Sequence, residues 1–188
     1  MTRLGAEWGT LRIYRPTAAQ VAAAAPRLRD FYNEPYNRAM LSHDEEMTAD
    51  DVVDHFADLA EHGVGFLLEH GGALAGDGDL RHLEAGAGEC AIMIGERGLQ
   101  GQGLGTRFLT MIHALAFGPV GLARVYATII PANTASLRLF EKLGYRRDDS
   151  PAARAYIDEP DDVSLSLERA DFLATHAAAL AEIRIDAT

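Results

Sequence analysis

Hydrophobic and polar positions recur along the chain in short runs whose lengths are typical of single strands and helices. Alternating or compact apolar runs predict seven strands, at residues 11–14, 64–69, 73–84, 89–94, 124–130, from 145 onward and 163–168. Helical spacing predicts helices that begin near residues 17, 48, 104 and 133, and an added C-terminal helix at about 170–183. This order indicates a mixed α/β or α+β fold, with residues 1–188 in a single domain.

Local signals refine the N-terminal part of this pattern. Thr17 and Gln20 stand at capping-box spacing, and Thr48 is positioned to cap a later helix. Pro26 either interrupts the first helix or begins a second turn. Residues 33–47 are rich in polar residues and predict a loop-like or weakly helical segment.

Four polar or reactive residues receive structural interpretations. Cys90, the one cysteine, lies in an apolar run and is expected to be buried without a disulfide. His113 lies off the apolar face of its helix and is expected to be solvated. Asp77 and Asp79 suggest a calcium loop, but the closing glutamate of a 12-residue loop is missing, which favours a solvated turn. No metal-ligand spacing appears, so the sequence predicts no metal.

Composition narrows the class of protein. The chain has 188 residues, of which 48% are hydrophobic and 24% are charged, as in ordinary globular proteins. The net charge of −11 argues against nucleic acid as a partner, because a phosphate backbone needs a basic face. No apolar stretch approaches ~20 residues, and the N-terminus lacks the apolar core of a signal peptide. These features predict a cytoplasmic protein that does not contact a membrane.

A glycine-rich segment carries the strongest functional signal. Residues 100–106 read Gln-Gly-Gln-Gly-Leu-Gly-Thr, between an apolar strand and an amphipathic helix. Backbone N–H groups at such a helix N-terminus are suited to bind phosphate. The loop of nucleoside triphosphatases is excluded, because Gly105 and not lysine precedes Thr106. The dinucleotide fingerprint is excluded as well, since its third glycine is replaced by Thr106 and residues 122–127 contain no acidic residue.

The spacing that does fit is Gln-x-x-Gly-x-Gly, which resembles the acetyl-CoA signature of the GNAT-type N-acetyltransferases. It is formed by Gln100, Gly103 and Gly105. The wider segment over residues 88–147 is similar to the subgroup that includes ribosomal-protein, spermidine and some antibiotic acetyltransferases. The supporting motifs are Ile92-Met93-Ile94-Gly95, Asn133-Thr134-Ala135-Ser136 and Leu139-Phe140-Glu141-Lys142-Leu143-Gly144-Tyr145. The resemblance implies the GNAT fold, a central mixed and mostly antiparallel sheet of about seven strands flanked by helices.

The resemblance also implies a reaction. Acetyl-CoA would be the co-substrate, and the acceptor would be a primary amine of a small cationic molecule, an aminated antibiotic or a protein N-terminus. A non-catalytic acyl-CoA-binding module and a transferase with another donor, such as succinyl-CoA, are the alternatives, and a homodimer stays open. The pantetheine arm would lie along the strand that precedes the signature. The residues implied to bind the donor are Met93, Ile94, Gln100, Gly101, Gln102, Gly103, Leu104, Gly105, Thr106, Asn133 and Phe140.

Candidate catalytic residues follow from the same resemblance. Glu89 is the candidate base, because several family members carry a catalytic glutamate on this strand; a solvated glutamate at a strand end is the alternative. Phe140 stands where many relatives have a tyrosine that serves as the acid, and phenylalanine cannot donate a proton. Ser136 matches a serine that some relatives use instead, although it is otherwise an ordinary first-turn residue. An acid is not required, since a thiolate with a pKa of ~8.5 is a tolerable leaving group.

The acceptor pocket of this family is formed mostly by the first helix-loop-helix and the last two strands. In this chain those regions are acidic and aromatic, which suits a cationic amine. The residues concerned are Tyr32, Glu34, Tyr36, His43, Asp44, Asp148, Asp149, Tyr156, Asp158 and Glu159.

Overall fold

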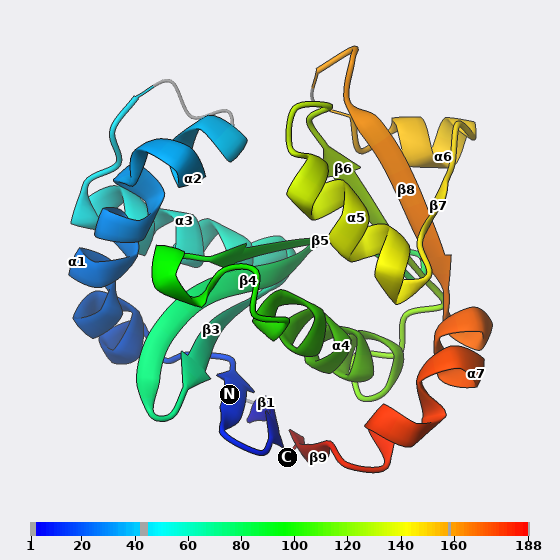
Figure 1. The fold of residues 1–188 in the computed structure, drawn as a ribbon, viewed down its shortest axis with the longest axis horizontal. Helices are drawn as coiled ribbons and strands as arrows, with labels where there is room; N and C mark the ends of the chain where they lie inside the picture. Colours follow the sequence, from blue (N-terminus) through cyan, green and yellow to red (C-terminus); the bar gives the residue numbers. More distant parts are fainter. Residues whose placement is uncertain (1–2, 42–44, 158, 188) are drawn as a thin grey trace.

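A nine-stranded sheet with helices on both faces forms the body of the protein (Figure 1). The computed structural model describes residues 3–41, 45–157 and 159–187. The strands are β1 (Leu4–Trp8), β2 (Leu11–Tyr14), β3 (Val64–His70), β4 (Ala73–Glu84), β5 (Ala87–Ile94), β6 (Arg124–Ile129), β7 (Arg146–Arg147), β8 (Val163–Glu168) and β9 (Arg184–Ala187). The helices are α1 (Ala18–Asn33), α2 (Pro35–Met40), α3 (Ala49–His62), the 3₁₀ helix η1 (Arg97–Leu99), α4 (Leu104–Phe117), α5 (Thr134–Leu143), α6 (Pro151–Arg154) and α7 (Arg169–Leu180).

The sheet is mixed and mostly antiparallel, as expected. Its order is β7-β8-β6-β5-β4-β3-β2-β1-β9, and β5 with β6 is the one parallel pair among the described strands. It contains two strands more than the seven predicted, namely β1 and β9, which pair with each other at one edge. All four residues of β9 are exposed, so this strand has no hydrophobic alternation by which the sequence could reveal it. No helix in the described ranges is long and apolar enough to cross a membrane.

The N-terminal helices follow their local signals. The Thr17 hydroxyl accepts a hydrogen bond from the backbone N–H of Gln20, and the Gln20 side chain accepts one from the backbone N–H of Thr17. The helix α1 continues through Pro26 without a break. The expected loop at 33–47 contains the short helix α2, which Glu34 caps at its N-terminus.

Two hydrophobic clusters pack against the two faces of the sheet. On one face, α1 and α3 contribute the first cluster, which includes Leu28, Phe31 and Phe56. On the other face, α4 lies across the strands, with α5 and α7 beside it (Figure 1). The helix α4 is therefore enclosed along most of its length, and its residues 108–117 are all buried.

The enclosure of α4 corrects the prediction for His113. This side chain is fully buried and not solvated. Its Nδ1 lies 2.8 Å from the carbonyl oxygen of Leu109, and its Nε2 lies 2.6 Å from the Tyr145 hydroxyl. The ring of Phe172 on α7 packs 5.7 Å from it, centroid to centroid. The expected exposure was wrong because α7 covers the second face of α4.

The predicted turn at Asp77 and Asp79 is also wrong. Both residues lie in the middle of β4 and are buried. A Cβ on Gly78 would lie 2.9 Å from the Cδ1 of Ile112 on α4 and 3.0 Å from the carbonyl oxygen of Ala91 on β5, so a side chain there would force both neighbours to shift. The aspartates alternate with the glycines and therefore project from the opposite face. Cys90 is buried, as predicted.

The sheet splits between β5 and β6. The two strands pair only where Ala87–Glu89 lies beside Arg124–Tyr126, and they then diverge (Figure 1). The second half of β5 therefore has β4 on one side and an open edge on the other. The site described next lies at this split.

Candidate functional site

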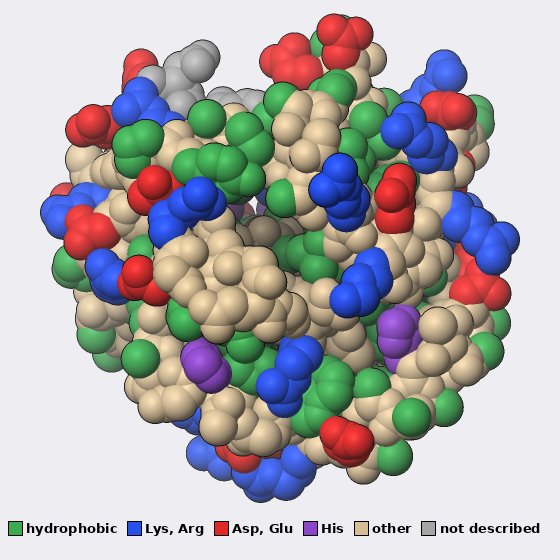
Figure 2. Space-filling model, viewed as in Figure 1, with side chains coloured by type: hydrophobic (Ala, Val, Ile, Leu, Met, Phe, Trp, Pro, Cys, Tyr) green, Lys and Arg blue, Asp and Glu red, His purple; other side chains and the backbone are tan. Residues whose placement is uncertain are grey.

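Two cavities of about 410 and 400 Å³ meet at the split between β5 and β6. We call the first the carboxylate cavity; its polar lining includes Tyr32, Asp77, Asp79, Arg81, Glu89, Glu159 and Asp162. We call the second the glycine-turn groove; its lining includes Tyr36, Ile94, Gly101, Gly103, Gly105, Thr106, Arg138 and Lys142. The two share a wall of Met40, Leu41, Ile92, Met93, Asn133 and Ser136. Figure 2 shows the surface hollowed near the centre of this face, with Lys and Arg side chains beside the hollow.

The glycine turn leaves open space at the N-terminus of α4. Gly101 and Gly103 have φ angles of 74° and 82°, a left-handed conformation that glycine adopts without strain. A Cβ on either residue would meet no described atom within 4 Å. Gly103 caps α4 without a hydrogen bond from any described side chain, so the first-turn N–H groups can receive an anion. Arg138 and Lys142 on α5 add positive charge to this groove.

The side chain of Gln100 fixes the turn to the rest of the groove. Its Nε2 donates to the carbonyl oxygen of Ile94 at 2.7 Å and to Oδ1 of Asn37 at 2.9 Å. The buried Asn37 side chain in turn donates to the carbonyl oxygens of Phe31 and Gly95, each at 3.0 Å. The Gln100 amide therefore holds β5, α2 and the turn in one arrangement.

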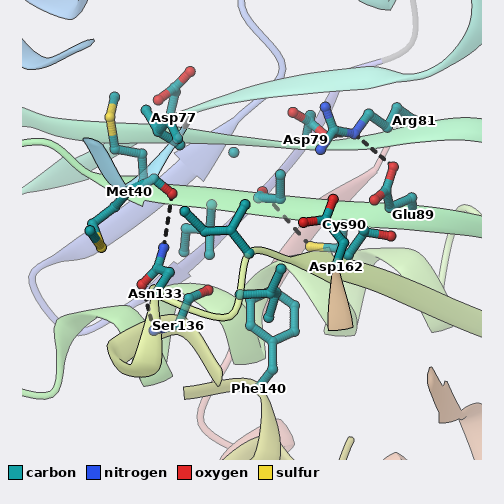
Figure 3. Close-up of a pocket in the computed structure, with 18 of the residues that line it drawn as sticks. Met40, Asp77, Asp79, Arg81, Glu89, Cys90, Asn133, Ser136, Phe140 and Asp162 are labelled. Atoms are coloured by element: carbon teal, nitrogen blue, oxygen red, sulfur yellow. Dashed lines mark hydrogen bonds and ion pairs between the residues drawn. The ribbon is translucent and has the colours of Figure 1, made fainter. Parts of the chain in front are cut away.

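Asn133 joins the two sides of the groove. Its Oδ1 accepts a hydrogen bond from the N–H of Ser136 at 3.0 Å, which confirms the predicted helix cap. Its Nδ2 donates to the carbonyl oxygen of Met40 on α2 at 3.1 Å (Figure 3). Ser136 consequently stands on the shared wall, beside both cavities.

Three residues of the predicted donor set lie elsewhere. Leu104 is buried in the core beneath the turn, and Gln102 is exposed with its side-chain amide bonded to the carbonyl oxygen of Gly98. Phe140 lines the carboxylate cavity and packs against the ring of Tyr145, with 5.0 Å between the centroids. The remaining predicted residues line the groove, namely Met93, Ile94, Gln100, Gly101, Gly103, Gly105, Thr106 and Asn133.

The carboxylate cavity contains a buried charged cluster on β4 and β5. Asp77, Asp79 and Arg81 lie opposite Met93, Ala91 and Glu89 in the register of the two strands. Figure 3 shows these β4 side chains across the pocket from Asn133, Ser136 and Phe140. Arg81 Nε lies 3.0 Å from Glu89 Oε2 and 3.6 Å from Asp79 Oδ1. The cluster is thus a row of three carboxylates with one arginine at its far end.

The two aspartates differ from Glu89 in their contacts. Asp77 and Asp79 are only 5% and 7% exposed. The Tyr32 hydroxyl donates to Asp77 Oδ2 at 2.5 Å. Neither Oδ1 of Asp77 nor Oδ1 of Asp79 has a hydrogen-bond partner in the part of the chain that the structure describes. Both oxygens are themselves buried, and buried acceptors without a partner are rare in folded proteins.

Burial shifts the titration of both aspartates toward neutral pH. Burial raises the pKa of Asp77 to about 7, and the charge of Asp79 adds to the rise while the Tyr32 hydrogen bond opposes it. Burial raises the pKa of Asp79 to about 6, against the opposing charge of Arg81. Carboxyls of this kind can take up and release a proton near neutral pH.

The structure brings the two predicted catalytic residues into one cavity, which also contains residues that the sequence analysis did not select. Glu89 and Ser136 both line the carboxylate cavity, and Glu89 is 4% exposed. Sequence reasoning missed Asp77, Asp79 and Arg81, although their spacing of two residues would place them on one face of a strand. It also missed Arg138 and Lys142, which stand four residues apart and hence on one face of a helix.

The expected acceptor residues are distributed differently. Tyr32 and Glu159 line the carboxylate cavity, whereas Tyr36 lines the glycine-turn groove. His43, Asp44 and Asp158 lie outside the described residues. The other expected acceptor residues line neither cavity; they are Glu34, Asp148, Asp149 and Tyr156. Among the described residues, no group of His, Cys, Asp and Glu side chains is arranged to hold a metal ion.

Comparisons with known proteins agree with this geometry. A family model described as an acetyltransferase (GNAT) domain matches residues 10–146. No curated protein matches the chain in sequence.

Several solved structures share the fold. Aminoglycoside acetyltransferase AAC(6')-Ib in complex with ribostamycin and coenzyme A has a TM-score of 0.74 and 18% identity, over 88% of this chain and 97% of that one. Spermidine N-acetyltransferase from Vibrio cholerae, in complex with CoA and spermine, has a TM-score of 0.72 and 14% identity, over 87% and 98%. Mycobacterium smegmatis RimJ, in complex with CoA-disulfide, has a TM-score of 0.65 and 16% identity, over 94% and 95%.

Proposed function

Since the chain belongs to the acetyltransferase (GNAT) family and is thus an acyltransferase, we propose that it moves an acetyl group from acetyl-CoA to a primary amine of a cationic acceptor. The observation that carries the proposal is the wall that the glycine-turn groove and the carboxylate cavity share. A donor in the groove and an amine in the cavity would meet there. This arrangement supports direct attack of the amine on the thioester in a ternary complex.

The glycine-turn groove suits the donor. Its open glycine turn and the helix N-terminus provide N–H groups for a pyrophosphate, and Arg138 with Lys142 would balance further phosphate charge. The open edge of β5 leads from this turn to Met93, and backbone groups along it can bind an amide-containing chain. The residues that would hold the donor are therefore Ile94, Gly101, Gly103, Gly105, Thr106 and Asn133, together with the two cations.

The carboxylate cavity suits a cationic acceptor. Among the residues that the structure describes, its lining contains five carboxylates, those of Asp77, Asp79, Glu89, Glu159 and Asp162, and a single arginine. Such a surplus of negative charge raises the local concentration of cations. Two of the similar structures hold polycationic molecules, ribostamycin and spermine. A protein N-terminus is the second acceptor class, favoured by the likeness to RimJ.

Protons must move in both directions during the transfer. The amine is cationic at neutral pH, with a pKa of ~10, and it must lose a proton before it attacks. Ser136 stands on the shared wall, and its hydroxyl would assist the leaving sulfur. Phe140 has no proton that it could donate to the sulfur. The sequence points to Glu89 for the opposite task, and the structure adds Asp77 and Asp79 as candidates.

A thiol-release assay tests the proposal. The purified protein is incubated with acetyl-CoA or succinyl-CoA and with spermine, kanamycin or a peptide that has a free N-terminal amine. We expect CoA release with acetyl-CoA that depends on a cationic amine. Tight acetyl-CoA binding by calorimetry, without acceptor-dependent CoA release from any combination, would contradict the proposed acceptor class. CoA release with succinyl-CoA but not with acetyl-CoA would show that acetyl-CoA is the wrong donor.

A further inference from the structure

We propose that Asp77 on β4, and not Glu89 on β5, is the catalytic base that takes the proton from the attacking amine. This inference rests on the proposed amine acetylation. It concerns a residue that resembles part of a turn in the sequence and that the fold instead places in the wall of the acceptor cavity.

Position along the strands separates the two carboxylates. The reaction must occur where the two cavities meet, and Met93 lies on that shared wall. Asp77 is the β4 residue directly opposite Met93 in the strand register. Glu89 precedes Met93 by four residues on β5, which corresponds to about 13 Å of extended chain. Asp77 is therefore next to the junction, whereas Glu89 lies well away from it.

Contacts separate them further. Glu89 forms an ion pair with Arg81 at 3.0 Å, so its carboxylate is already engaged with a cation. Asp77 has one oxygen held by the Tyr32 hydroxyl at 2.5 Å, which fixes the orientation of the carboxylate. Its second oxygen, Oδ1, lacks a hydrogen-bond partner among the described residues. Oδ1 is itself buried, and it is the oxygen of this cavity-lining carboxyl that is left to accept a proton.

The surroundings of Asp77 suit a base that works near neutral pH. The other titratable or charged residues of the cavity that Asp77 lines are Tyr32 on α1, His55 on α3, Asp79 and Arg81 on β4, Glu89 on β5, and Glu159 and Asp162 before β8. Burial raises the pKa of Asp77 to about 7, with a further rise from Asp79. A base with this pKa is half ionised at pH 7 and can pass its proton on to water in each cycle.

The chemical step balances as follows in atoms and charge. The acceptor ammonium gives one proton to Asp77 Oδ1 and becomes a neutral amine with a free electron pair. The amine nitrogen forms a C–N bond to the acetyl carbonyl carbon, and the C–S bond of the thioester breaks. The sulfur leaves with the electron pair of that bond and takes the second proton that nitrogen loses as it becomes an amide. Asp77 then returns its proton to solvent.

Matched amide variants test the assignment. Asp77→Asn, Asp79→Asn and Glu89→Gln each remove one charge with little change in shape. With the amine that the protein acetylates best, Asp77→Asn should lower kcat by at least ~100-fold, the usual loss for a missing general base. The acid limb of the pH profile should disappear in that variant. Glu89→Gln should keep the limb and lose less than tenfold in kcat. A larger loss with Glu89→Gln, accompanied by loss of its acid limb, would overturn the inference and assign the base to Glu89.

A variant of the residue that orients Asp77 gives a second readout. Tyr32→Phe removes a hydrogen bond that lowers the pKa of Asp77, so the acid limb of kcat/KM should move to higher pH. A merely structural role of Asp77 would leave the limb where it is. An unmoved limb in a folded Tyr32→Phe variant would therefore contradict the inference.

A titration without acceptor separates this inference from the proposed function. In protein labelled with ¹³C at aspartate carboxyls, the resonance that Asp77→Asn removes identifies Asp77. Its midpoint should lie near neutral pH in the ligand-free protein. A midpoint in the ordinary aspartate range overturns the assignment of Asp77 even if every amine is acetylated. A neutral midpoint together with no acetylation of any amine contradicts the proposed acceptor instead.

Discussion

The Gln100 side chain donates a hydrogen bond to the Asn37 side chain across 2.9 Å, and this contact joins the glycine turn to α2. The two residues are 63 positions apart in the sequence. The first glutamine of the signature therefore acts through its side chain on the protein itself, while the open positions of the turn are the glycines Gly101 and Gly103.

Loss of this contact should weaken donor binding. Gln100→Ala leaves the buried Asn37 oxygen without its partner, at a cost of ~1–3 kcal/mol, and it releases the turn from β5. We expect a lower melting temperature and a weaker calorimetric affinity for acetyl-CoA. Asn37→Ala and the double variant complete a cycle, in which the two losses should be less than additive because both remove the same bond. Full additivity would show that the contact does not position the turn.

The glycines of the turn should be essential for the donor. Gly103→Val places a branched side chain at a φ of 82° and in the open space beside the N-terminus of α4. Acetyl-CoA binding should be abolished in calorimetry. Gly98→Ala is the matched control, since Gly98 is outside the left-handed region and a Cβ there meets nothing within 4 Å. Unchanged acetyl-CoA affinity in a folded Gly103→Val protein would remove residues 100–106 from the donor site.

The buried Asp77 carboxylate, when it is ionised at high pH, should lower the stability of the folded protein. Its pKa is about 7 in the folded protein and 3.8 as the ordinary value, so the folded state binds the proton more tightly. Stability therefore falls as pH rises from about 4 to about 7 and stays low above that. Asp77→Asn removes this buried charge and keeps an acceptor for the Tyr32 hydroxyl. Its melting temperature should exceed that of the original protein at pH 8, and the difference should shrink as pH falls toward 4. Equal melting curves at pH 8 would contradict the buried charge.

His113 should have the opposite effect on the pH dependence of stability, which it lowers as the pH falls. Burial lowers the pKa of His113 from 6.5 to about 4, so the unfolded chain binds a proton more readily than the folded protein. The stability due to the neutral ring is present above pH 6.5 and is lost as pH falls toward 4, by on the order of 3 kcal/mol. The difference in unfolding free energy between the original protein and His113→Gln should shrink across this range. Urea titrations at pH 7.5, 5.5 and 4.5 measure it, and a constant difference would refute a buried neutral histidine.

Salt should affect acceptor and donor differently. The net charge of −11 and the acid-lined cavity attract a cation, and this attraction is screened beyond ~10 Å at 0.1 M salt. The KM for spermine or kanamycin should therefore rise with ionic strength. The acetyl-CoA KM should follow a different trend, because the donor is an anion and the groove proposed for it is lined by Arg138 and Lys142. A preference for neutral acceptors with no salt dependence would rule out this steering.

Much of the sheet could be predicted because its strands alternate or are continuously apolar. The edge strand β9 could not, since all four of its residues are exposed and backbone pairing with β1 holds it. The strand β1 was missed although Leu4, Ala6 and Trp8 alternate with Gly5 and Glu7. The exposure expected for His113 failed for a related reason. Its helix face is covered by Phe172 of α7, a contact across 59 residues of sequence that the helical pattern does not contain.

The site shows the same limit. The glycine turn has a spacing that is visible in the sequence, and the structure places it at the N-terminus of α4 as expected. The segment Gly76-Asp77-Gly78-Asp79 has the composition of a turn, and local propensity favours that interpretation. Tertiary packing overrides it, because the glycines admit β5 and α4 closely on one side and the aspartates line a cavity on the other. Only the fold reveals this division of the strand.

The split between β5 and β6 gives the sheet a seam. Three paired positions connect the block that contains β5 to the block that contains β6, and the rest of the seam has no backbone partner from the neighbouring strand. A donor bound along the open edge would act as a splint across the two blocks. The stability of the contact between the two blocks would then depend on how much of the protein has CoA bound. Amide exchange along residues 90–94 should slow, and resistance to proteolysis should rise, in proportion to the fraction of protein that holds CoA.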